Sequence, residues 1–224
     1  MSPDSSVYID SSRAALIDGG VQIVSNLTAI RPTKTSILYH GVHSKTGKPA
    51  IVKTLNPNHN DLIYGREVYQ AEMQAYQELA PYHHANIAEY LIGYTTEYPI
   101  IVTEFVGPSL MEVLRQINIY NLPKFNRTGE YNIYSQLVNI FKIFELVGGH
   151  RNLTPNNLVV AHPNGTPINK IEEVKQIQNE FRLKAIDPGN MVGGLIMPSP
   201  NYTHNDWADI VLIMEQIKDQ GYIQ

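Results

Sequence analysis

The chain has 224 residues, of which 43% are hydrophobic and 17% are charged, enough for one two-lobed domain or two small domains. Its 17 basic and 21 acidic residues give a net charge of −4, and with no long basic run we expect no nucleic-acid partner. The absence of cysteine excludes disulfides and thiolate metal sites. The sequence contains no apolar run of about eighteen residues, so we expect no membrane span.

Residues 1–19 are rich in serine and other polar residues, and we expect them to form a flexible N-terminal lead-in. They contain no basic segment followed by an apolar run, which predicts a cytoplasmic protein without a classical signal peptide. A cysteine-free composition of this kind is also compatible with an effector that is secreted into a host cytosol. Apolar residues between 16 and 30 predict the first strand, which Gly19 and Gly20 interrupt.

The next two predicted elements carry Lys53 and Glu72. The string AIVK at residues 50–53 predicts a strand that ends on Lys53. Glu72 follows in a predicted helix, whose apolar stripe runs from Val68 to Leu79 at helical spacing. Because Glu72 borders this stripe, we expect its carboxylate to point inward.

Several strings occur in the order in which protein kinases carry their sequence motifs. The most informative is HRNLTPNNL at residues 150–158, which is similar to the kinase catalytic loop H-R-D-L-x-x-x-x-N. With Lys53 and Glu72 in their elements, the chain resembles the protein kinase-like family. The other matching features are HANI at 84–87, an apolar strand with a turn and a helix start at 100–110, DPG at 187–189 and NDWADIV at 205–211.

This resemblance implies an α+β chain with the bilobal protein kinase-like fold. The N-lobe, residues 20–106, would hold an antiparallel sheet and the family's helix αC. The C-lobe, residues 107–224, would be shortened and mainly helical, and would end near the family's helix αF. The elements expected in the C-lobe are a helix from about 132 to 147, a β pair around 157–160 and 183–186, and a last helix in which Asn205 or Asp206 orients the catalytic loop.

The resemblance also implies a site for ATP and Mg²⁺ in the cleft between the lobes. Lys53 would hold the nucleotide phosphates and pair with Glu72, with Glu67 as the second candidate for this pairing. Asn157 and Asp187 would bind Mg²⁺, because both carry the oxygen ligands that this ion prefers.

Two further stretches are expected to lie beside the nucleotide. The glycine-rich loop of kinases is replaced by residues 31–38, which contain no glycine, so side chains would contact the phosphates in place of backbone. The alternative is a hairpin that only covers the site loosely. The residues expected beside the phosphates are Thr33, Lys34 and Ser36, and those beside the adenine are the gatekeeper Thr103, then Glu104 and Val106.

Asn152 stands at the catalytic-base position, where the family has an aspartate that accepts the hydroxyl proton of the substrate. An asparagine amide can hydrogen-bond this hydroxyl but cannot take up its proton. We therefore expect a pseudokinase or very weak kinase that acts through contacts with a protein partner. Two alternatives stay open. One is an active minimal Ser/Thr protein kinase in which Asn152 is engineered or tolerated, with a protein substrate. The other is a small-molecule phosphotransferase, since IDPG at 186–189 resembles aminoglycoside phosphotransferases.

Residues 161–182 form an insert relative to the kinase pattern. Its apolar residues recur at helical spacing and predict an amphipathic helix. We expect this helix to pack on its own lobe, with binding of a partner as the alternative. The residues of the apolar stripe are Ile168, Ile171, Val174, Ile177 and Phe181.

Overall fold

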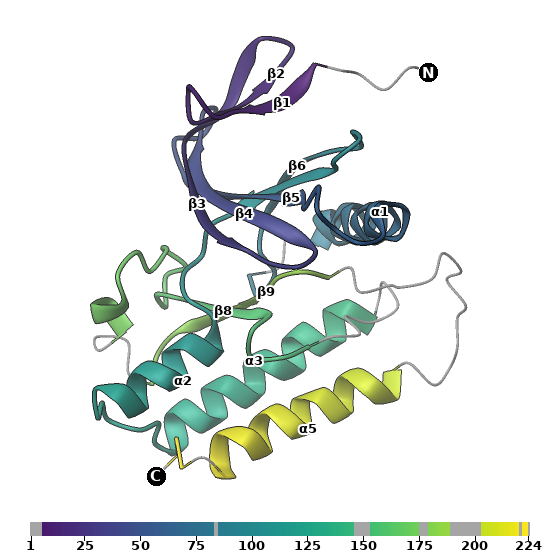
Figure 1. Cartoon of the computed structure of the whole chain (residues 1–224). Helices are drawn as coiled ribbons and strands as arrows, with labels where there is room; N and C mark the ends of the chain where they lie inside the picture. The colour runs from purple at the N-terminus through teal and green to yellow at the C-terminus, as the bar shows by residue number, and fades with distance from the viewer. Residues whose placement is uncertain are drawn as a thin grey trace. The chain divides into compact units, whose positions relative to one another are not determined.

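The computed structural model of the chain describes residues 6–82, 85–145, 153–174, 179–188, 203–219 and 221–223. The chain is an α+β protein that divides into two compact units. The first unit comprises residues up to 80 together with 89–105, and holds a seven-stranded antiparallel sheet with one helix, α1 (Figure 1). The second comprises 81–88 and most residues from 106 onward, and its described part holds α2, α3, α5 and a two-stranded hairpin.

The sheet of the first unit is curled, and every neighbouring pair of its strands is antiparallel. The strands follow one another in sequence order except for the last two. The seventh strand in sequence lies beside the fifth, and the sixth strand lies at the edge of the sheet. In the order of hydrogen bonding, the strands are β1 (Val7–Asp10), β2 (Ala15–Asp18), β3 (Val21–Pro32), β4 (Ser36–His43), β5 (Pro49–Leu55), β7 (Ile100–Glu104) and β6 (Tyr90–Tyr94).

The expectation of a flexible lead-in over residues 1–19 is wrong for its described part, because β1 and β2 form a hairpin at the edge of the sheet (Figure 1, purple). The apolar residues 15–17 are almost completely buried, so the hairpin contributes to the hydrophobic core. Gly19 (φ 54°) and Gly20 (φ 83°) then form the turn from β2 to β3, because glycine adopts positive φ without a steric penalty. The prediction was wrong because it rested on the serine-rich composition of residues 1–19, in which this short apolar segment does not stand out.

Helix α1 (Leu62–Leu79) begins at Asp61, whose side chain accepts a hydrogen bond from the backbone N–H of Tyr64. Its buried face packs on the sheet and is turned slightly from the predicted stripe, since Val68 is only half-buried. A short 3-10 turn, η1 (Ala80–Tyr82), follows. The cluster between helix and sheet consists of Leu55, Tyr69, Met73, Tyr76 and Ile101.

The second unit contains α2 (Leu110–Ile119), α3 (Arg127–Glu145) and α5 (Thr203–Asp219), with β8 (Leu158–Ala161) paired to β9 (Arg182–Ala185). Both strands lie within one residue of the expected β pair. Helix α3 begins earlier than expected because Asn126 caps it, accepting hydrogen bonds from the backbone of residues 128 and 129. The side chains of Asn205 and Asp206 in α5 lie outside the described residues. Within the described part of the chain, no helix is long and apolar enough to cross a bilayer.

The insert differs from the single amphipathic helix that we predicted. Its described part contains a 3-10 turn, η2 (Ile171–Glu173), followed by Val174 in helical conformation, while residues 175–178 lie outside the described residues. The backbone N–H of Ile168, the first residue of the predicted stripe, donates to the carbonyl of Val106, and this residue lies outside any helix. The stripe residues whose burial is described are Ile168, Val174 and Phe181, and all three are buried within their own unit.

Candidate functional site

Strand β5 and helix α1 bring Lys53 and Glu72 together in the first unit. Lys53 lies in the sheet opposite Leu38 and Ile101, and its Nζ is 2.7 Å from Oε2 of Glu72. The side chain of Glu72 is 3% exposed and that of Lys53 is 16% exposed, so this is an ion pair largely withdrawn from water. Glu67, the second candidate, is exposed on α1, so Glu72 is the carboxylate that pairs with Lys53.

Tyr69 connects this ion pair to the turn between β3 and β4. The Lys53 ammonium lies 5.4 Å from the centroid of the Tyr69 ring, within the range of a cation–π interaction. The Tyr69 hydroxyl donates a buried hydrogen bond of 2.9 Å to Oγ of Ser36. The same buried tyrosine therefore fixes both the ammonium and the start of β4. Sequence reasoning assigned no role to Tyr69, although its helical spacing from Glu72 and Met73 placed it on the same face.

The glycine-free turn at residues 33–35 is held by its own side chains. The backbone N–H of Ser36 donates to Oγ1 of Thr33 (2.9 Å), and the N–H of Thr33 donates to the carbonyl of Ser36 (2.7 Å). Thr33 and Lys34 are exposed, whereas Ser36 is buried and its hydroxyl accepts the Tyr69 bond. Ser36 thus has a structural role in the turn, and contact of Thr33 and Lys34 with phosphate stays a prediction.

The hairpin of the second unit brings Asn157 and Asp187 to the same end of the β8–β9 pair, although thirty residues separate them. Leu158 is paired with Ala185, and one step further the backbone N–H of Ile186 donates to the carbonyl of Asn157 at 3.0 Å. Both candidate metal ligands are half-buried. Asp187 has a φ of 55°, a left-handed conformation that is uncommon for residues other than glycine, although aspartate and asparagine adopt it more readily than the rest, and that is often found at functional sites.

Asn86 anchors β9, and with it the position of Asp187, within the second unit. Its side-chain amide donates to Oε1 of Gln136 (2.8 Å) and to the carbonyl of Leu183 (2.7 Å), and Asn86 is 6% exposed. Its backbone carbonyl accepts a hydrogen bond from Ala185 (2.8 Å). Sequence reasoning identified the HANI string but not this function of its asparagine, which is to tie α3 and β9 together.

Asn157 and Asp187 carry side-chain oxygens of the kind that Mg²⁺ binds, and the binding of Mg²⁺ by them stays a prediction. One carboxylate and one amide oxygen are hard ligands, and Mg²⁺ in nucleotide sites takes its remaining ligands from water and phosphate. Across the ranges that the structure describes, no group of three or more His, Cys, Asp or Glu side chains could hold a metal alone. The donor set therefore suits an ion that is shared with a phosphate ligand.

The predicted adenine residues belong to the end of β7 and to the segment after it. In the first unit, Thr103 lies opposite Ile51 of β5, and the carboxylate of Glu104 accepts a hydrogen bond from the backbone of Glu89. In the second unit, Val106 is buried and its carbonyl accepts the N–H of Ile168. That carbonyl is therefore already engaged, and the role of all three residues in adenine binding stays a prediction.

Gly107 is required by the close packing of the backbone next to Val106. A Cβ atom at this position would lie 2.2 Å from the carbonyl oxygen of Val160, and its φ of 151° is unfavourable for other residues. The carbonyl of Pro108 accepts the N–H of Val160, and Ser109 then caps α2 by accepting a hydrogen bond from Glu112. The expected turn and helix start are thus present at these residues.

Asn152, the residue at the catalytic-base position, lies outside the described residues. The described part of the HRNLTPNNL string begins at Leu153, which is 2% exposed. The N–H of Asn157 donates to the carbonyl of Thr154 at 2.9 Å, forming a turn that leads into β8.

A comparison with protein-family models and with curated proteins finds no match to this chain.

Proposed function

We propose that this chain is a kinase-like nucleotide-binding protein that holds Mg-ATP and transfers phosphate weakly or not at all. The observation that carries this proposal is the buried ion pair of Lys53 and Glu72. A buried ion pair contributes little to stability compared with apolar residues of the same volume, because desolvation offsets the attraction. The need to hold the Lys53 ammonium in place for a ligand therefore explains this ion pair better than a contribution to folding stability does.

The proposed roles divide between the two units. The Lys53 ammonium, fixed by Glu72, binds phosphate oxygens of the nucleotide. Asn157 and Asp187 hold Mg²⁺, which when bound neutralises charge on the phosphates. Their shared position at one end of β8–β9 and the left-handed backbone of Asp187 support this assignment. The bilobal kinase-like arrangement, with adenine beside Thr103, Glu104 and Val106, belongs to the same proposal.

Asn152 limits the reaction that such a site performs. A general base contributes about two to four orders of magnitude in rate, and an amide cannot serve as one. In a loose phosphoryl-transfer transition state the attacking hydroxyl carries little charge, so the loss falls toward the lower end of that range. The main output of the protein is then a contact with a protein partner that depends on bound nucleotide.

Thermal unfolding with and without Mg-ATP tests nucleotide binding. A ligand that binds only the folded state at a hundred times its Kd raises stability by about 2.7 kcal/mol. We expect the wild type to show this rise, and Asp187→Asn to lose it while keeping its fold, since asparagine tolerates a positive φ. Lys48→Met is the control for an unrelated surface substitution, because Lys48 is an exposed lysine in the turn between β4 and β5. No rise at millimolar Mg-ATP, or the same rise in Asp187→Asn, would contradict the proposal.

An active kinase is the second candidate, and the positions of Asn157 and Asp187 favour it, because a scaffold without nucleotide needs neither oxygen ligand. An Asn152→Asp variant separates the two candidates in an assay with labelled ATP. A gain of about a hundredfold in phosphate transfer indicates an otherwise competent enzyme. Mg-ATP binding without any gain supports the scaffold. Protein and aminoglycoside acceptors assayed in parallel distinguish the two substrate classes.

A further inference from the structure

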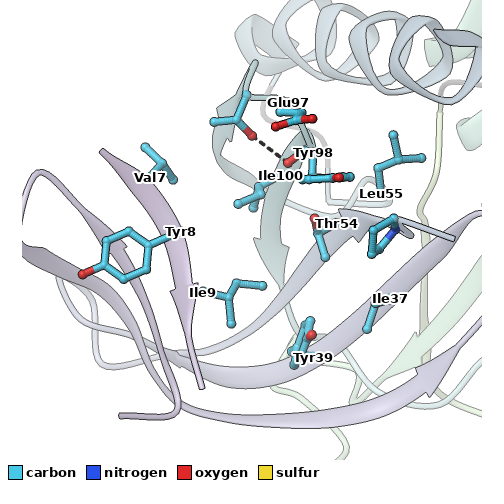
Figure 2. Close-up of a pocket in the computed structure, with 12 residues that line it drawn as sticks. Val7, Tyr8, Ile9, Ile37, Tyr39, Thr54, Leu55, Glu97, Tyr98 and Ile100 are labelled. Atoms are coloured by element: carbon cyan, nitrogen blue, oxygen red, sulfur yellow. Dashed lines mark hydrogen bonds between the residues drawn. The ribbon is translucent and has the colours of Figure 1, made fainter. Parts of the chain in front are cut away.

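The first unit contains a cavity of about 450 Å³ that no part of the proposed nucleotide site uses. Figure 2 shows its walls, which come from segments far apart in the sequence. Val7 to Ile9 of the β1 edge strand form one side, and Thr96 to Tyr98 of the turn between β6 and β7 form another. The hairpin that was not expected from the sequence therefore creates this cavity by extending the sheet past β3.

The floor of the cavity is a row of residues across three neighbouring strands. Ile37 of β4 is paired with Thr54 of β5, and Thr54 is paired with Ile100 of β7. Directly opposed residues of antiparallel strands place their side chains on the same face, and all three line the cavity. Lys53 precedes Thr54 in β5, so its side chain lies on the other face of the sheet. The cavity is thus separate from the Lys53–Glu72 pair.

Thr54 is the polar group of this floor. It is 7% exposed, and in the described part of the chain no hydrogen bond engages its hydroxyl. Thr54 lines the cavity, and its hydroxyl is not among the completely buried polar atoms without a partner, so the hydroxyl stays accessible there, whereas valine would have the same shape without a hydrogen-bonding group. A threonine at this place therefore offers a donor and an acceptor to a molecule in the cavity.

The rest of the lining selects against a charged ligand. Aliphatic side chains and the rings of Tyr8, Tyr39 and Tyr98 make up most of it. Among the described residues of the lining Glu97 is the one charged residue, but its side chain is 72% exposed and lies 3.9 Å from Arg66. No lysine or arginine is among the described residues of the lining to neutralise an anion. The volume is within the range of about 300–1,000 Å³ that small-molecule sites occupy.

We propose that this cavity is a second ligand site, which binds a neutral, mostly apolar small molecule through one hydrogen-bonding group at the Thr54 hydroxyl. The site does not depend on the nucleotide proposal, because it lies within the first unit and on the opposite face of β5 from Lys53.

A fluorescence titration with N-phenyl-1-naphthylamine tests this assignment, since the probe is neutral and apolar and carries a single N–H. We expect saturable binding at one site per chain. Thr54→Val should weaken the affinity roughly two- to tenfold, the range for loss of one hydrogen bond. Ile37→Trp should abolish binding by filling the cavity. Ile30→Trp is the matched control, since Ile30 is 54% exposed on β3 outside the cavity, and it should bind as the wild type does.

Thermal unfolding of each variant verifies that it is folded, and the conservative Thr54→Val variant keeps the test decisive if Ile37→Trp does not fold. Unsaturable binding, or equal binding by Ile37→Trp and Ile30→Trp, overturns the site. Wild-type affinity in Thr54→Val overturns the assignment of the hydrogen-bonding group. None of these results depends on whether Mg-ATP binds.

Discussion

Removal of the Lys53 ammonium alone should destabilise the first unit strongly, whereas removal of both charges of the pair should not. The side chains of Glu72 and Lys53 are only 3% and 16% exposed, so water screens neither charge fully. Lys53→Met leaves the Glu72 carboxylate without the partner that now lies 2.7 Å away, and breaking such a pair costs about 3–5 kcal/mol. Lys53→Met/Glu72→Met removes the buried charge as well, and we expect it to lie within about 1 kcal/mol of the wild type.

Hydrogen exchange read by mass spectrometry measures this free energy in peptides from α1 and β5, and so reports on the first unit alone. Arg66→Met is the matched control in the same helix. The guanidinium of Arg66 lies 3.9 Å from the exposed carboxylate of Glu97, and its loss should cost at most about 1 kcal/mol. If Lys53→Met costs no more than Arg66→Met, or if the double variant is as unstable as Lys53→Met, the reasoning about a buried ion pair is refuted.

Three further variants test the titration of Tyr94, the close packing at Gly107 and the hydrogen bonds of Asn86. Burial, and secondly the charge of Asp18, raise the pKa of Tyr94 to about 12. The folded state therefore keeps this proton longer than the unfolded state does, and part of the stability is lost as the pH rises from about 10 to about 12. Urea unfolding at about pH 9 and about pH 11 should show a smaller loss in Tyr94→Phe than in the wild type. Gly107→Ala should cost more than about 2 kcal/mol, because its Cβ would lie 2.2 Å from the carbonyl of Val160; a melting temperature equal to that of the wild type would contradict this. Asn86→Ala breaks one buried and one partly buried hydrogen bond and should cost about 2–3 kcal/mol, measured as faster hydrogen exchange in peptides covering β9; unchanged exchange there would show that Asn86 does not anchor this strand.

Local patterns predicted those parts of the structure that depend on neighbouring residues. Helical spacing in residues 62–79 placed Glu72 on the inward side of its helix, and the apolar string at 50–53 placed Lys53 in a strand. Turn and capping residues at 107–109 similarly marked the start of α2. In each case periodicity or a capping residue within a few positions carried the information.

The misses arise where distant segments decide the structure. The β1–β2 hairpin is too short to stand out from its serine-rich surroundings, and it is stabilised by burial against residues far along the chain. The insert at 161–182 has helical spacing, but Ile168, the first residue of its apolar stripe, hydrogen-bonds to the backbone of Val106 and is not helical. The role of Asn86 depends on α3 and β9, about fifty and about a hundred residues away. No local pattern contains these partners.

The central claim is that Lys53 and Asp187 both contribute to the binding of Mg-ATP, and calorimetric titration of ATP with and without Mg²⁺ tests it most directly. Lys53→Met/Glu72→Met serves here as a variant that lacks the ammonium but should keep the fold. We predict that Mg²⁺ raises the affinity of the wild type for ATP at least tenfold. Asp187→Asn should lose this dependence on Mg²⁺, and the double variant should bind more weakly in both conditions. Equal ATP affinity in all three proteins, or no binding by the wild type at millimolar ATP, would contradict the account.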